Sequence, residues 1–210
     1  MSNLKRKNRI KIYNKISAIA IYKLKRRKVT LITFLILSAS FFAYFIWSQK
    51  VLITEGVSFE NTEKAKLHDE ISAMVKGYPI EQMVPYIVEW DPIVAAFLVS
   101  IAKKESAWGR HVPVLNGQDC YNYWGYRGIR DRMGTGGHTC FDSPKDAVDT
   151  VGKRIHDLVI KQNLNTPEKM IVWKCGSSCA GHSNYGVQKW ISDVNLYFQK
   201  IVNKTQAEQK

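Results

Sequence analysis

The longest uncharged stretch of the chain constrains its fold most. Residues 29–49 read VTLITFLILSASFFAYFIWSQ, which is 21 residues without a charged side chain. At about 1.5 Å of rise per residue, a helix of this length crosses a hydrocarbon core of roughly 30 Å. The stretch therefore predicts one transmembrane helix.

The charges on either side of this stretch predict its orientation. The net charge of the chain is +13, and residues 1–28 contain eleven Lys and Arg but no Asp or Glu. By the positive-inside rule, the N-terminus stays in the cytoplasm and the chain after about residue 50 is extracytoplasmic. A cleaved signal peptide, with the Ser-Ala-Ser sequence at 38–40 as its cleavage site, is the alternative. The apolar run continues to Trp47, which favours an uncleaved anchor.

The basic segment 1–28 also bears on the partners of the protein. A nucleic-acid-binding domain carries its basic residues on a folded face, whereas here the other 182 residues hold 20 basic and 18 acidic side chains. A short basic arm beside a membrane is attracted to anionic lipid. We therefore expect a single-pass protein of the cytoplasmic membrane and no nucleic-acid partner.

Helical patterns dominate the chain after the apolar stretch. Residues 50–61 are predicted to be a linker, 62–204 one mainly α domain and 205–210 a polar tail. Asp91-Pro92 is a favourable cap and first-turn pair, so it predicts the start of a helix that Gly109 ends. Further helices are expected over residues 61–76, 143–160, 166–173 and 187–202. The Gly-rich stretch 111–140 predicts loops and a small hairpin, with Gly134, Gly136 and Gly137 at its turn.

One acid interrupts the apolar stripe of the helix that begins at Pro92. Glu105 lies four residues after Ile101 and seven after Leu98, which places it on the apolar face by helical spacing. Burial would raise the pKa of this carboxyl, which is the property that a general acid requires. The alternative is a solvent-exposed residue at a fraying helix end, or one that pairs with Arg110.

Two short motifs surround this acid. Glu105-Ser106-Ala107-Trp108-Gly109 is followed after a polar loop by Asn122-Tyr123-Trp124-Gly125. The pair resembles the lysozyme-like superfamily of peptidoglycan-cleaving enzymes, and within it the bacterial endo-β-N-acetylglucosaminidase family that includes flagellar muramidase domains. Soluble lytic transglycosylases are next in pattern. The resemblance covers roughly residues 78–202 and implies a mainly α, lysozyme-like α+β domain with a small hairpin or loop region.

By this resemblance, Glu105 is the catalytic acid in cleavage of β-1,4 bonds between N-acetylated amino sugars of the cell-wall glycan. Tyr185 falls where the family tends to have an active-site tyrosine. Asp131 is the only carboxylate in the stretch where the family usually offers a second acid. It stands between two arginines, so a solvated turn residue paired with arginine is the alternative. Without a second acid, the acetamido group or the 6-hydroxyl of the substrate acts as nucleophile, and the latter gives the anhydro product of a lytic transglycosylase.

The residues of the second motif are candidate saccharide contacts, because sugar rings bury C–H patches against aromatic faces. The aromatic candidates are Tyr123, Trp124 and Tyr126, although Trp124 also suits a core position. Asn122 is expected to hydrogen-bond a sugar hydroxyl or acetamido group, or else to brace the loop. A non-catalytic module that binds peptidoglycan through the same groove is the alternative to an enzyme.

Four cysteines lie in the part expected to be exported. In an oxidising compartment, this even number predicts two disulfides with three possible connectivities. We favour Cys120 with Cys140, which closes the loop that carries the second motif, and Cys175 with Cys179 as a local clip. A zinc site that adds His138 or His182 is the alternative. Export disfavours it, and no metal or other cofactor is expected.

Overall fold

The structure is a computed structural model. It describes Arg26, Phe34, residues 37–48 and residues 61–207. The chain divides into two compact units, Met1–Phe59 and Glu60–Lys210, and each is described by itself.

The described part of the first unit is chiefly a helix over residues 37–48 with exposed apolar side chains, among them Phe41 and Phe42. Within the part of the chain that the structure describes, no helix has the length and apolar character needed to span a bilayer. The predicted span 29–49 extends beyond the described residues at both ends. The basic segment 1–28, apart from Arg26, and residues 50–60 of the linker also lie outside them. The transmembrane helix and its orientation therefore stay predictions.

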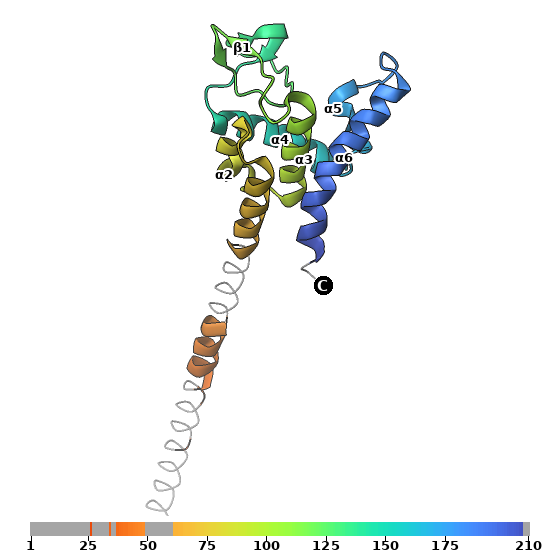
Figure 1. Cartoon of the computed structure of the whole chain (residues 1–210). Coiled ribbons are helices and arrows are strands. Elements are labelled where there is room, and N and C mark those ends of the chain that lie inside the picture. Colours follow the sequence, from red (N-terminus) through yellow and green to blue (C-terminus); the bar gives the residue numbers. More distant parts are fainter. Residues whose placement is uncertain (1–25, 27–33, 35–36, 49–60, 208–210) are drawn as a thin grey trace, which may run out of the picture. The chain divides into compact units, whose positions relative to one another are not determined.

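The second unit is mainly helical, as the sequence predicts (Figure 1). It opens with a helix over residues 61–75, which is followed by a short 3₁₀ turn and a single helical turn. The elements after it are η1 (Pro79–Met83), α2 (Val84–Ile87), α3 (Pro92–Ser106), α4 (Pro144–Gln162), η3 (Lys169–Ile171), α5 (Val172–Cys175) and α6 (Asn184–Ala207).

Side-chain caps begin the two long central helices where the sequence predicts. Asp91 Oδ1 accepts a hydrogen bond from the Ile93 amide at 2.9 Å, and Ser143 Oγ accepts one from the Asp146 amide at 3.1 Å. These bonds satisfy amides that have no partner inside the helix. Helix α3 ends before the expected Gly109, because Ala107 takes a left-handed conformation with φ of 51°.

Helix α6 is longer than the predicted 187–202. It begins at Asn184 and runs to Ala207, into the residues predicted to form a polar tail. Its start is marked by Ser183, whose Oγ accepts a hydrogen bond from the Gly186 amide at 3.1 Å. The apolar periodicity predicts only the packed middle of this helix, because the polar ends carry no periodic signal.

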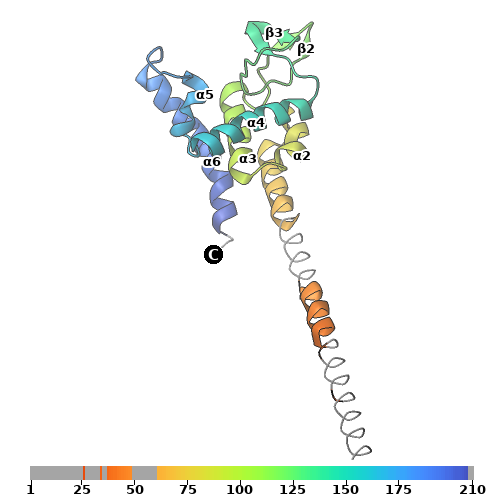
Figure 2. The ribbon, with the colours of Figure 1, turned by 180° about the vertical axis from the view of Figure 1, so that it is seen from behind.

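Helix α3 forms the centre of the core and packs against both α4 and α6 (Figure 2). Every residue from Val94 to Ala102 is buried, so nearly the whole circumference of this helix is covered. The rings of Phe97 and Phe198 lie 4.4 Å apart between α3 and α6. Leu67 and Ile71 of the first helix belong to the same core.

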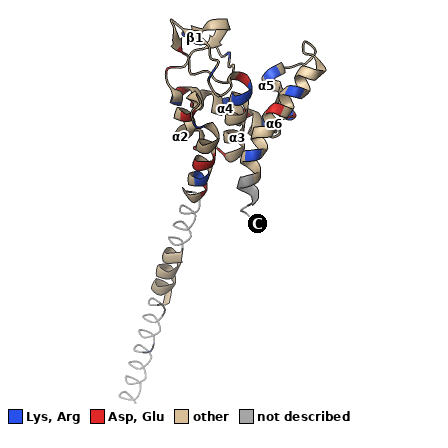
Figure 3. Cartoon of the chain, in the orientation of Figure 1, with Lys and Arg blue, Asp and Glu red and all other residues tan. Residues whose placement is uncertain are grey.

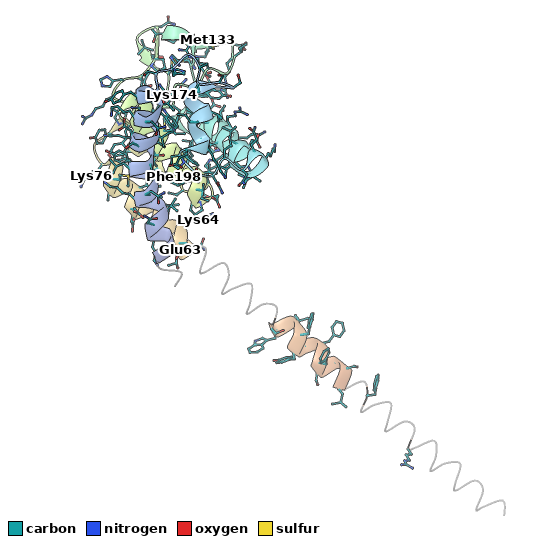
Figure 4. The ribbon with its side chains drawn as sticks, turned by 90° about the vertical axis from the view of Figure 1, so that its right-hand side faces the viewer. Glu63, Lys64, Lys76, Met133, Lys174 and Phe198 are labelled. Carbon is teal, nitrogen blue, oxygen red and sulfur yellow. A yellow bond between two sulfur atoms is a disulfide. The ribbon has the colours of Figure 1, made fainter. Side chains whose placement is uncertain are left out.

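Two short hairpins make up the loop region. One pairs β1 (Val114–Leu115) with β2 (Gln118–Asp119), and the other pairs β3 (Met133–Gly134) with β4 (His138–Thr139) across η2 (Thr135–Gly137). The second hairpin and its glycine turn are as predicted. The first was missed, although its turn is an Asn-Gly pair with both φ values positive, which is a strong hairpin signal. In Figure 4, Met133 lies at the opposite end of the unit from Glu63 and Lys64.

Basic and acidic side chains share the helices of this unit and do not gather on separate helices (Figure 3). Asp193 of α6 pairs with Lys189 of the same helix at 2.9 Å and with Lys104 of α3 at 2.6 Å. One acid of α6 thus pairs with lysines of two helices.

Candidate active site

Glu105 lies in the last turn of α3 and is exposed. Its Oε1 accepts a hydrogen bond from the indole nitrogen of Trp190 at 2.7 Å. Trp190 belongs to α6 and is only 1% exposed, so a ring fixed in the core orients a carboxylate at the surface.

The expectation that Glu105 is buried is therefore wrong. Its spacing from Leu98 and Ile101 predicts burial only if the covered stripe continues to the helix end. Helix α3 is covered on nearly all sides along its middle, and its last turn emerges from the core. At such an end, helical spacing from buried residues no longer decides exposure.

Ser106 joins the two sequence motifs. Its Oγ lies 2.8 Å from the carbonyl oxygen of Tyr123 and accepts a hydrogen bond from the Gly109 amide at 2.9 Å. The serine after the acid therefore holds the backbone of the second motif against the end of α3. This contact explains why a small hydroxyl residue follows Glu105.

Gly125 brings the second motif next to the acid. A Cβ atom added to Gly125 would lie 3.7 Å from Glu105 Oε2 and 4.0 Å from His138 Cε1. The φ of Gly125 is +67°, a conformation that side-chain-bearing residues rarely adopt. The structure thus places the carboxylate, a bare stretch of backbone and an imidazole around one point.

Asn122 braces the loop and does not face a ligand. Its amide nitrogen donates to the carbonyl oxygens of Tyr126 and Thr139, both at 2.8 Å, and its Oδ1 accepts from the Tyr126 amide at 2.9 Å. The side chain is buried, so of the two expected roles the structure shows the bracing one. As a correction, Asn122 has no surface with which to bind a sugar.

Tyr123 and Trp124 are also corrected as saccharide contacts, because both are 0% exposed. The Tyr123 hydroxyl donates to Asp119 Oδ2 at 3.0 Å, and Trp124 Nε1 donates to the Leu98 carbonyl at 2.7 Å. Burial raises the pKa of Tyr123, and the nearby charge of Asp119 raises it further. Both rings are core residues that fix the loop on α3.

Tyr126 is half-buried and lines a hollow of about 500 Å³. Its ring lies 6.2 Å from that of Trp173, at an interplanar angle of 29°. Trp173 Nε1 donates to the carbonyl oxygen of Trp124 at 2.9 Å. Gly125 lines the same hollow, so the hollow begins beside Glu105.

A second hollow, of about 670 Å³, is lined by His138 together with Thr135, Gly136 and Arg110. Gly125 lines the first hollow and His138 lines the second, and an added Cβ at Gly125 would be close to both His138 and Glu105. The carboxylate therefore lies beside a residue of the first hollow.

His138 lies beside an arginine. Arg127 Nη2 is 3.2 Å from His138 Nε2. Among the described residues, the buried Nδ1 has no hydrogen-bond partner. The cysteines form the disulfides Cys120–Cys140 and Cys175–Cys179, which is the pairing that we favoured. They therefore offer no thiolates for the alternative zinc site.

Asp131 and Tyr185 are not brought to Glu105 by any contact in the described structure. Asp131 is exposed and lines a separate hollow, while its neighbours Arg130 and Arg132 pair with Asp146 and Asp142 in its place. Tyr185 is 77% exposed in the first turn of α6. It precedes Trp190 by five residues, which is about 140° around the helix, so the two face different directions.

The sequence prediction missed Trp190 and Trp173 as site residues, and it named His138 only for the zinc alternative. A tryptophan on a buried stripe needs a partner for its N–H, and this is the signal that points to Trp190. The partner itself lies 85 positions away on another helix. Its identity therefore follows only from the packing of α3 against α6.

The chain matches no family model, no curated protein and no solved structure. A functional assignment therefore depends on the residues around Glu105.

Proposed function

We propose that this chain is a membrane-anchored enzyme that cleaves β-1,4 bonds between N-acetylated amino sugars of bacterial peptidoglycan, with Glu105 as general acid. One observation carries the proposal: the Glu105 carboxylate is exposed, accepts a hydrogen bond from Trp190 and lies beside Gly125, which lines a hollow. A general acid must come within hydrogen-bond distance of the oxygen that it protonates. The exposed position of Glu105 allows a substrate to come within this distance.

The chemistry follows from the surroundings of this carboxylate. Glu105 gives its proton to the glycosidic oxygen as the bond to the anomeric carbon breaks, and positive charge develops on the sugar ring. Gly125 has no side chain, so a sugar can approach the carboxylate closely over the backbone there. A sugar in that position would also displace water from Glu105.

The position of Asp131 supports a route with a single protein acid. Asp131 is the only acid between Tyr121 and Cys140, and it lines another hollow together with Arg130 and Arg132. The nucleophile then comes from the substrate. Attack by the acetamido group, followed by water, gives hydrolysis, whereas attack by the 6-hydroxyl gives the anhydro end of a lytic transglycosylase.

The test uses the full-length chain in detergent with purified peptidoglycan sacculi. The wild-type protein is expected to release soluble glycan fragments, and Glu105→Gln to release them at least about 100-fold more slowly, the usual loss on removal of a general acid. Glu168→Gln changes another exposed glutamate, outside the site, and is the matched control. Equal rates for Glu105→Gln and wild type would overturn the proposal.

Mass analysis of the released fragments divides the two routes. Reducing ends show hydrolysis, and anhydro ends show transglycosylation. If the wild-type protein binds sacculi but releases nothing, the chain is a peptidoglycan-binding module and not an enzyme.

The membrane anchor is the second part of the proposal, and it depends on the apolar residues 29–49. The expected result is that the chain remains in the membrane fraction at alkaline pH, and that protease added outside the cytoplasmic membrane digests the second unit. Release of the intact chain by alkali would contradict the anchor and leave the assignment of Glu105 in place.

A further inference from the structure

The hollow beside Gly125 has an unusual charge. The loop after the second motif, the C-terminal half of α4 and the segment around α5 line it. Two guanidinium groups, Arg127 and Arg154, are among the residues that line it, and none of these residues is an acid. A pair of arginines in a hollow with no acid in its lining favours an anionic ligand.

Arg154 is the freer of the two arginines. It is exposed on α4, and no ion pair within 4.0 Å involves it among the described residues. Asp149 and Asp157 line a neighbouring hollow with it, but they pair with Lys145 and Lys161. Leu158 and Gln162 follow Arg154 at intervals of four residues and line the same hollow as Gly125. All three therefore lie along one stripe of α4 that faces the hollow.

Arg127 is already held in place. Its Nη1 donates to the Gly136 carbonyl at 2.7 Å, and its Nη2 lies 3.2 Å from His138 Nε2. These contacts occupy two of its five donors. They fix its positive charge at the side of the hollow nearer to Glu105.

Two aromatic residues that line the hollow suit a sugar ring. Tyr126 and Trp173 form the stacked pair described above, and the bond from Trp173 Nε1 to the Trp124 carbonyl fixes the larger ring. Gly176 and Ser177, which lie between the cysteines of the Cys175–Cys179 disulfide, also line the hollow. The hollow thus combines aromatic faces with a free arginine.

We propose that this hollow is a subsite for a saccharide that carries a carboxylate, with the sugar ring against Trp173 and Tyr126 and the carboxylate paired with Arg154. The inference rests on the proposed function, because Gly125 makes the hollow continuous with the surroundings of Glu105. Its consequence is selectivity. A glycan whose ether-linked carboxylate is free, as in N-acetylmuramic acid without its stem peptide, binds here more tightly than a neutral N-acetylglucosamine polymer.

Binding is measured by calorimetry with the full-length Glu105→Gln chain in detergent, which separates binding from cleavage. The two probes are a peptide-free tetrasaccharide of alternating N-acetylglucosamine and N-acetylmuramic acid, and the neutral tetramer of N-acetylglucosamine. We expect the acidic tetrasaccharide to bind about tenfold more tightly, as one charge-assisted hydrogen bond provides. Adding Arg154→Gln is expected to reduce this ratio to near one and to leave the neutral probe unaffected.

Two further variants test whether the preference for the acidic probe depends on the guanidinium group of Arg154. Arg154→Lys keeps the charge without the planar fork, so an intermediate ratio is expected. Arg132→Gln removes an arginine that pairs with Asp142 in another hollow, and the ratio should not change. The subsite is overturned if the protein without the Arg154 substitution binds both probes equally well. It is also overturned if Arg154→Gln leaves the preference for the acidic tetrasaccharide unchanged.

Failure of the subsite and failure of the proposed function are distinguishable. If the wild type cleaves sacculi but Arg154→Gln does not change the affinity ratio of the two probes, the proposed function is supported and this subsite is not. If the ratio depends on Arg154 but nothing is cleaved, the hollow binds acidic glycan in a protein that is not an enzyme.

Discussion

The indole N–H of Trp190 points to the carboxylate of Glu105 across the contact between α6 and α3. The two residues differ sharply in their surroundings, since the ring is almost wholly buried and the carboxylate is exposed. The position of the acid therefore depends on how two helices pack, and not on the loop alone.

The first prediction removes this hydrogen bond and keeps the aromatic ring. Trp190→Phe is expected to lower the rate of glycan release about tenfold, because a bond to a charged group contributes about 1.5–3 kcal/mol and each 1.4 kcal/mol in the barrier is a factor of ten. Trp108→Phe removes another buried indole bond, from Nε1 to the Val99 carbonyl at 2.9 Å, away from the acid. Equal rate losses in the two variants would show that Trp190 acts through stability alone.

The second prediction concerns the bare backbone beside the acid. Gly125→Ala places a methyl group 3.7 Å from Glu105 Oε2, in the path of a bound sugar, and is expected to reduce glycan release strongly. Gly117→Ala is the matched control, since Gly117 also has a positive φ, 78°, but nothing lies within 4 Å of an added Cβ. Both variants should lose about 1 kcal/mol of stability to left-handed strain. If both kept full activity, the sugar would not pass over Gly125.

The third prediction separates the disulfides by the length of chain that each closes. Cys120–Cys140 spans 20 positions and Cys175–Cys179 spans 4. In the chain-entropy estimate, replacement of both cysteines by alanine costs about 3 kcal/mol for the first bridge and about 2 kcal/mol for the second. Chemical denaturation of the two double variants measures the difference, and the reverse order would mean that native-state strain dominates.

The fourth prediction concerns pH. Burial by itself raises the pKa of Asp146, but the hydrogen bonds and charge of Arg130 outweigh it, so the pKa of the folded carboxyl lies below the ordinary 3.8. The pair therefore stabilises the fold at neutral pH, and this contribution is lost as the pH falls below about 3.8 through the folded value. Arg130→Met should cost about 1 kcal/mol at pH 7, because the pair is about one-third exposed, and less at pH 3.

Thermal unfolding at both pH values provides the check. Lys145→Met breaks the more exposed pair with Asp149 on the same helix and should change the unfolding temperature little at either pH. A loss of stability by Arg130→Met that is the same at both pH values would exclude a role for the Asp146 charge.

Much of the fold follows from local sequence signals. Asp91-Pro92 and Ser143-Pro144 predict the starts of α3 and α4, because a cap and a first-turn proline act within four residues. The pairing of the cysteines is also local for Cys175–Cys179. Elements whose limits depend on distant packing are predicted less well, as the ends of α6 show.

The candidate site, too, is only partly predictable from local sequence signals. The motifs that contain Glu105 and Gly125 are visible in the sequence, and the structure brings them together through Ser106. The exposure of each residue is not visible. Tyr123 and Trp124 are buried because their polar atoms find partners on Asp119 and α3, and no pattern within the motif reveals these partners.

The Cys175–Cys179 bridge has a consequence for when the site is complete. Gly176 and Ser177 stand between the two bridged cysteines and line the hollow beside Trp173. Disulfides persist in oxidising compartments and are kept reduced in the cytosol. Under the proposed topology, the bridge is expected to close only after the second unit is exported, so the loop that carries Gly176 and Ser177 would take its final form on the outer side of the membrane.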